Sequence, residues 1–187
     1  MPRPTSIEGL AIVSADGMLA DPNGHMPASL LVEADQRFFQ DSLDQAAVLV
    51  QGRHSHEGGG PRADHRRRLV VTTRIAALAD YPARPHALLW NPKGASLEAA
   101  WARLGAPDGT LAVIGGTNVY GMFLGIGYDR FHLSHAPQVR LPGGRPVFPE
   151  VGPDRSPGDV LASHGLKPSA PRMLDEATGV TLVTWSR

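Results

Sequence analysis

The chain has 187 residues, and its 18 basic and 18 acidic side chains leave no net charge, which argues against a general nucleic-acid binder with a basic surface. The absence of cysteine excludes disulfides, thiol nucleophiles and cysteine metal sites. Hydrophobic residues make up 42% of the chain, enough for a core, and no apolar run resembles a signal peptide or a membrane span. We therefore expect one cytoplasmic domain over residues 1–187.

The first half of the chain alternates apolar runs with turn-forming residues. After the first apolar run the chain reaches Asp16-Gly17 and a loop rich in proline and glycine. Residues 30–45 then have the spacing of an amphipathic helix, with Ser29 as its expected cap. Strands are predicted at residues 10–13, 46–53, 68–74 and 86–91.

The second half continues the alternation of strand and helix. Ser96 and Gly105 bound one predicted helix, and residues 117–125 form another. Strands are predicted at residues 110–116 and 128–136, and a final antiparallel pair at 159–167 and 179–187. This order indicates an α/β fold with a mainly parallel sheet, helices on both faces, and ligands at the carboxyl ends of the strands.

Two glycines, Gly115 and Gly116, stand where a predicted strand passes into a predicted helix. The helix would begin at Thr117, and the amino end of a helix offers unpaired N–H groups to a phosphate. A tight turn explains the two glycines equally well. They do not form the usual dinucleotide-binding fingerprint.

Polar residues also follow two other predicted strands. Arg53, His54 and Ser55 come after one, and the segment 72–74 ends the next. Arginine and hydroxyl groups suit an additional phosphate, although each set alone is typical of solvated residues at a strand end. Three such strand ends in one sheet favour a nucleotide with several phosphates.

The histidines show no ligand spacing on a helix face, so we expect no metal site. Ser14, Ser42 and Ser134 lie outside the sequence context of a hydrolase nucleophile.

Four segments, "VLVQGRHSHE", "RRLVVTTR", "LAVIGGTNVYGMFL" and "YDRFHLSHA", resemble the dihydrofolate reductase family in order and spacing, from about Ile7 to Pro149. The resemblance implies a three-layer α/β fold with an antiparallel strand pair at the end of the chain, and NADPH as cofactor. It implies a 2′-phosphate pocket at the first segment and a pyrophosphate cradle at the third. The expected cofactor-binding residues are Gly52, Arg53, His54, Ser55, Thr72, Thr73, Arg74, Ile114, Gly115, Gly116, Thr117, Asn118, Val119 and Tyr120, the last near the nicotinamide.

The substrate half resembles the family less closely. Met26 and Pro27 match a family motif, but Ala28 replaces its tryptophan. Asp35 corresponds to the family's catalytic acid, since Phe39 follows it at the family's spacing. A solvated charge is an equally good interpretation of Asp35.

Glu33 is the competing choice for the acid. Arg66 aligns with the family arginine that pairs with the glutamate tail of folate. Expected substrate-binding residues are therefore Met26, Phe39 and Arg66.

The expected activity is NADPH-dependent hydride transfer to a pterin-like substrate. The Asp16-Gly17 and Glu33-Ala34 pairs also fit the related pyrimidine reductase domain of riboflavin biosynthesis. A non-catalytic nucleotide-binding relative is the third reading. The expected partner is a small pterin or pyrimidine molecule, without nucleic acid or membrane, and a homodimer is left open.

Overall fold

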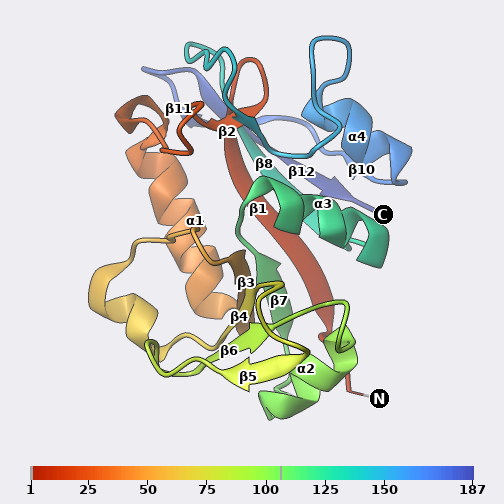
Figure 1. The fold of residues 1–187 in the computed structure, drawn as a ribbon. Coiled ribbons are helices and arrows are strands. Elements are labelled where there is room, and N and C mark those ends of the chain that lie inside the picture. Colours follow the sequence, from red (N-terminus) through yellow and green to blue (C-terminus); the bar gives the residue numbers. More distant parts are fainter. Residues whose placement is uncertain (1, 106) are drawn as a thin grey trace.

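The computed structural model describes residues 2–105 and 107–187 and is built around one large sheet (Figure 1). The strands are β1 (Ser6–Ser14), β2 (Met18–Ala20), β3 (Val48–Gly52), β4 (Arg68–Val71), β5 (Leu78–Asp80), β6 (Ala87–Trp90), β7 (Thr110–Val113), β8 (Arg130–Ala136), β9 (Arg145–Pro146), β10 (Lys167–Pro168), β11 (Arg172–Asp175) and β12 (Val180–Ser186). The helices are α1 (Glu33–Gln45), α2 (Leu97–Arg103), α3 (Thr117–Ile126) and α4 (Pro157–Ser163), with short 3-10 turns at Ala28–Leu30 and Gly60–His65.

The sheet is mainly parallel. Its strands follow the order β10-β12-β8-β1-β7-β3-β4-β6-β5, with β11 also paired to β12. Strands β8, β1, β7, β3, β4 and β6 are parallel, whereas β12 runs antiparallel to β8 and β5 antiparallel to β6. The predicted parallel sheet with an antiparallel carboxyl-terminal pairing is confirmed.

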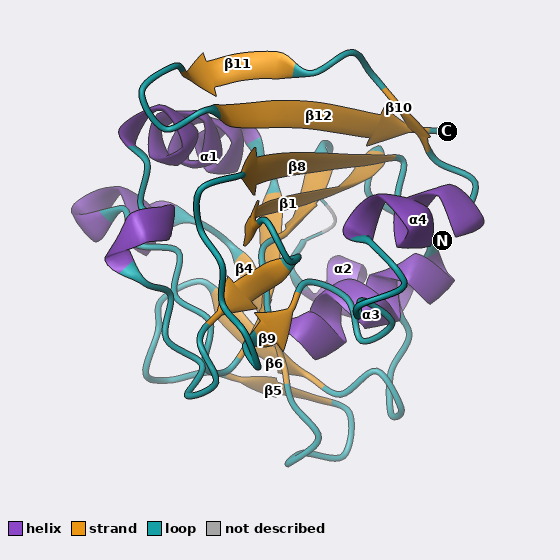
Figure 2. Ribbon diagram, turned by 90° about the horizontal axis from the view of Figure 1, so that it is seen from above, coloured by secondary structure: helices purple, strands orange, loops and turns teal. Residues whose placement is uncertain are grey.

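Helices cover both faces of this sheet, as predicted (Figures 1 and 2). Helix α1 packs on one face through Leu43, against Leu10 and Leu49. Helices α2, α3 and α4 cover the other face, where the larger hydrophobic cluster lies. Its largest side chains, each fully buried, include Trp90, Trp101, Phe123, Phe131 and Phe148.

The strand prediction for residues 159–167 was wrong, because most of this segment belongs to α4. Ser156 accepts a hydrogen bond from the Asp159 amide, while the Asp159 carboxylate accepts one from the Ser156 amide. This reciprocal capping satisfies two free donors, and Pro157 suits the first helical position. Only Lys167–Pro168 forms a strand, so β12 pairs instead with β8, β11 and β10.

The prediction that Ser29 caps the first helix was also wrong. Ser29 lies in the 3-10 turn Ala28–Leu30, and α1 begins at Glu33 after Val32, without a side-chain cap. The chain therefore makes a separate turn before α1, with Leu30 fully buried beneath it.

Candidate active site

Three of the predicted binding segments follow neighbouring strands. Strands β7, β3 and β4 are adjacent and parallel, so their carboxyl ends meet at one edge of the sheet. The amide of Gly52, at the end of β3, donates to the carbonyl of Gly115 beyond β7 at 3.0 Å. The structure thus brings together segments that are far apart in the sequence.

The two glycines after β7 differ in what they require. Gly115 has a φ of +136°, a conformation that residues with a Cβ rarely adopt. Gly116 has an ordinary φ of −81°, and the peptide between them is cis. A Cβ on Gly116 would meet only the Ser55 hydroxyl, at 3.7 Å. The fold therefore requires Gly115 for the turn, whereas the backbone at Gly116 is open to an approaching ligand.

The segment after β3 is a tight turn. The Ser55 amide donates to the Gly52 carbonyl at 3.2 Å, which makes Arg53 and His54 the corner residues. Arg53 is half-buried, His54 is exposed, and the Ser55 hydroxyl lies beside Gly115. The turn presents a cation and polar groups next to the open glycine backbone.

The segment after β4 is stabilised by Thr72. Its buried side chain accepts a hydrogen bond from the Arg74 amide at 3.2 Å, while Thr73 and Arg74 are exposed. The β4 strand ends at Val71, so these three residues leave the sheet beside the β3 turn. A second cation, Arg74, therefore stands at the same edge, and this one is exposed.

Helix α3 begins directly after Gly116. The Thr117 hydroxyl donates to the Pro146 carbonyl, Asn118 is exposed, and the side chain of Val119 is buried in the core. Tyr120 is also buried, and its hydroxyl donates to the Leu10 carbonyl of β1. Burial raises the pKa of Tyr120, and the charge of the nearby carboxylate on Asp35 raises it further.

The two candidate acids of α1 point in different directions. At about 100° per residue, positions 33 and 35 differ by roughly 200° around the helix. Glu33 is exposed and pairs with Arg37 at 2.9 Å, whereas Asp35 is only 5% exposed. Burial raises the pKa of Asp35, and hydrogen bonding to Ser134 opposes that rise. Of the two candidate acids, Asp35 is the buried one, and buried ionisable groups concentrate at functional sites.

Asp35 shares its surroundings with groups that the sequence had not singled out as site residues. Ser134 lies on β8 and is fully buried, and Leu10 on neighbouring β1 offers the carbonyl that binds Tyr120. Ser134 lies near Asp35 because α1 packs across β1 and β8. Spacing along the chain carried no such signal.

The expected substrate residues lie in different settings. Phe39 is half-buried in the cluster around Leu10, and Met26 is 41% exposed in the loop before α1. Arg66 is buried and donates to Asp44 at 2.6 Å and to Gln40 at 2.8 Å. The Arg66 guanidinium thus already has a carboxylate partner within the chain.

Comparison with known proteins gives matches among solved structures alone. Neither a protein-family model nor a curated protein sequence matches the chain. A dihydrofolate reductase from Enterococcus faecalis, complexed with NADP(H) and RAB-propyl, matches with a TM-score of 0.65 at 20% identity, over 97% of this chain and 96% of that one. The chain has the dihydrofolate-reductase fold. The resemblance seen at the strand ends is confirmed at this level.

Two further structures share the dihydrofolate-reductase fold with this chain. A protein assigned to riboflavin biosynthesis from Shewanella sp. PV-4 matches with a TM-score of 0.64 at 17% identity, over 98% of this chain and 99% of that one. A diaminohydroxyphosphoribosylaminopyrimidine deaminase/5-amino-6-(5-phosphoribosylamino)uracil reductase from Thermotoga maritima gives the same TM-score and identity. This chain covers 56% of the Thermotoga chain and is itself covered to 98%.

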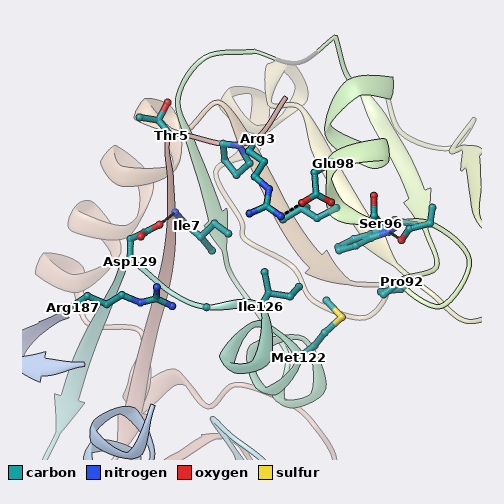
Figure 3. A pocket seen from close by; sticks show the side chains of 15 residues that line it. Arg3, Thr5, Ile7, Pro92, Ser96, Glu98, Met122, Ile126, Asp129 and Arg187 are labelled. Carbon is teal, nitrogen blue, oxygen red and sulfur yellow. Dashed lines mark hydrogen bonds and ion pairs between the residues drawn. The ribbon is translucent and has the colours of Figure 1, made fainter. Parts of the chain in front are cut away.

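A further cavity of about 640 Å³ has none of the predicted site residues in its lining (Figure 3). It is lined by the entry to β1, the loop before β8 and the start of α2. Three of its charged groups have partners within the chain: Arg3 pairs with Glu98, and Asp129 accepts a hydrogen bond from the Ile7 amide at 2.8 Å. Within the dihydrofolate-reductase fold, this cavity lies outside the predicted cofactor and substrate positions.

Residues 2–105 and 107–187 contain no helix with the length and apolar character needed to cross a bilayer. The same ranges hold no group of three side chains suited to binding a metal ion.

Proposed function

We propose that the chain is an NADPH-dependent reductase that transfers hydride to a pterin-like substrate. The observation that carries this proposal is the buried Asp35 carboxyl. In the part of the chain that the structure describes, no cationic side chain forms an ion pair with it. Burying an ionisable carboxyl without a counter-ion costs folding free energy, and such groups concentrate at functional sites.

The fit to NADPH rests on the joined ends of β3 and β7. The open backbone at Gly116 and the amides at the start of α3 would hold the pyrophosphate. Arg53, His54 and Ser55, with Thr72 to Arg74 beside them, would hold the 2′-phosphate. The Enterococcus structure, complexed with NADP(H), supports this assignment. When bound, NADPH supplies the hydride.

The chain's own contribution to the chemistry is a proton and an orientation. Burial raises the pKa of the Asp35 carboxyl, so it keeps its proton to a higher pH than a solvated aspartate does and can share that proton with a ring nitrogen of the substrate. Protonation of that nitrogen makes the adjacent carbon a better hydride acceptor. Phe39, four residues after Asp35, lies on the same side of α1 and would contact the plane of the ring.

A pyrimidine reductase of the riboflavin-biosynthesis type is the second candidate. Two of the structural neighbours carry riboflavin-pathway or uracil-reductase names. The pairing of Arg66 with Asp44 also favours it, because the guanidinium expected to bind a folate tail is engaged within the chain.

The test is NADPH oxidation, measured with dihydrofolate and separately with the ribosylaminopyrimidine intermediate. Turnover with dihydrofolate is the expected result. Turnover with the pyrimidine alone would support the second candidate. Tight NADPH binding without turnover of either compound would contradict both and leave a nucleotide-binding relative without this chemistry.

A further inference from the structure

A buried polar network underlies the connection between β3 and β4. Arg68, the first residue of β4, is 1% exposed, and its guanidinium forms an ion pair with the buried carboxylate of Glu57. It also donates to the Ala63 carbonyl at 2.7 Å. A positive charge and a negative charge are therefore enclosed together inside the loop that follows the Arg53–Ser55 turn.

Gln51 links this ion pair to the turn. The β3–β4 register pairs Leu49 with Arg68, so Gln51, two residues after Leu49, lies on the same face as Arg68. Its side-chain oxygen accepts from Arg68 at 3.5 Å, and its side-chain nitrogen donates to the Ser55 carbonyl at 3.0 Å. The turn is thus held from beneath as well as by its own backbone hydrogen bond.

A second amide fixes the chain just beyond the turn. Gln40 of α1 donates to the Glu57 carbonyl at 2.6 Å. The carbonyls of Ser55 and Glu57 are therefore both bound by side-chain amides from outside the loop. The path of the backbone through residues 53–57 is defined from β3, β4 and α1 together.

Stability alone is a weak explanation for this network. Apolar residues of similar volume usually stabilise a core as well as a buried ion pair does. Arg68 Nε and Glu57 Oε2 have no hydrogen-bond partner among the described residues, although Arg84 Nη1 lies 3.6 Å from that oxygen. What the network does define is the position of the turn.

We infer that Gln51, Arg68 and Glu57 are positioning residues that orient the Arg53–Ser55 turn toward the 2′-phosphate and so set the preference for NADPH over NADH. This inference rests on the proposed function. The Gly116 backbone and the start of α3 belong to other elements, so their contact with a pyrophosphate does not depend on the network. Loosening the turn should therefore weaken NADPH binding selectively.

The test compares affinities for NADPH and NADH in wild type and in Gln51→Met, which keeps the length of the side chain but removes its amide. The wild type should bind NADPH more tightly. In the variant that preference should fall by about tenfold, as expected for losing one charge-assisted phosphate contact, with NADH affinity unchanged. Ser156→Ala serves as the control, because it removes the α4 cap and lowers Tm far from the turn. Its preference for NADPH should equal that of the wild type.

Glu57→Gln provides a second measurement if Gln51→Met does not fold. It keeps an oxygen that can accept from Arg68 but removes the negative charge, and the same selective loss is expected. A lower Tm with the wild-type cofactor preference in either folded variant would overturn the inference and leave the proposed function standing. Equal affinities for the two cofactors in the wild type would overturn the NADPH assignment and this inference together.

Discussion

The amide of Gly52 donates a hydrogen bond to the carbonyl of Gly115 at 3.0 Å, which joins the ends of β3 and β7. This contact sets the Arg53–Ser55 turn beside the glycine turn that precedes α3. The two turns are the segments that we assign to different phosphates of one cofactor. Changes in each turn should therefore have separable effects on cofactor binding.

Gly116→Ala should weaken NADPH binding by about tenfold or more with little loss of stability. The new Cβ meets only the Ser55 hydroxyl at 3.7 Å, an ordinary contact, but it occupies the open space assigned to the pyrophosphate. Calorimetric titration with NADPH and a thermal melt are the two measurements. A wild-type affinity for NADPH in this variant would contradict the assignment of the Gly116 backbone to the pyrophosphate.

Gly115→Ala is the matched control for that experiment. Its φ of +136° disfavours any residue with a Cβ, at a cost of about 1–3 kcal/mol. This variant should lose stability as well as affinity. Equal melting temperatures for the two variants would mean that the positive φ of Gly115 does not make its substitution more costly than that of Gly116.

Arg53→Ala should reduce affinity for NADPH by about tenfold and leave affinity for NADH almost unchanged. The guanidinium at the corner of the turn is assigned to the 2′-phosphate, and a charge-assisted contact contributes about 1.5–3 kcal/mol. Binding of each dinucleotide is measured separately. A similar loss for both would remove Arg53 from the 2′-phosphate pocket.

Asp35→Asn should preserve NADPH affinity and abolish most turnover, most severely near neutral pH. The substitution keeps the size of the side chain but removes its titratable proton. Glu33→Gln is the control, because Glu33 is exposed and paired with Arg37. Its turnover should match the wild type. A loss in Glu33→Gln with none in Asp35→Asn would assign the acid to Glu33.

Asp35→Asn should also raise thermal stability at neutral pH. The folded pKa of Asp35 lies above its unfolded value, so the stability it contributes is complete below the unfolded pKa and is lost as pH rises through the folded pKa. The variant avoids this loss, because its side chain does not ionise. The Tm difference should shrink as the pH is lowered toward 3.8, the ordinary aspartate value. A lower Tm for the variant throughout would show that Ser134 stabilises the carboxylate more than burial penalises it.

The sequence predicted the central strands because their apolar runs are long enough to recognise. It also places Arg53 and the two glycines Gly115 and Gly116 just after strands, as the structure has them, whereas their binding of a nucleotide is our proposal. The short strands β2, β5, β9, β10 and β11 were not predicted, since their two to four residues are too few to show a hydrophobic period. The apolar content of residues 159–167 predicts a strand, but Ser156 and Asp159 have the spacing of a capping box and begin a helix.

The features of the candidate site that the sequence does not predict depend on tertiary packing. Asp35 was open to interpretation as a solvated charge, because its burial depends on β8 and not on its own helix. Ser134 reaches the acid, and the Leu10 carbonyl binds Tyr120, only because β1 and β8 lie side by side beneath α1. The pairing of Arg66 with Asp44 likewise joins two segments whose proximity the sequence does not encode locally.

The groups assigned to the nucleotide come from the exits of β3, β4 and β7, whereas the acid and Phe39 come from α1. Apart from Gln40, which binds the Glu57 carbonyl, residues of α1 and of the loop before it can therefore be substituted to change the proposed substrate pocket without moving the backbone assigned to the nucleotide. If these assignments hold, a chain built in this way can acquire a new specificity stepwise, because each intermediate sequence retains the proposed NADPH site.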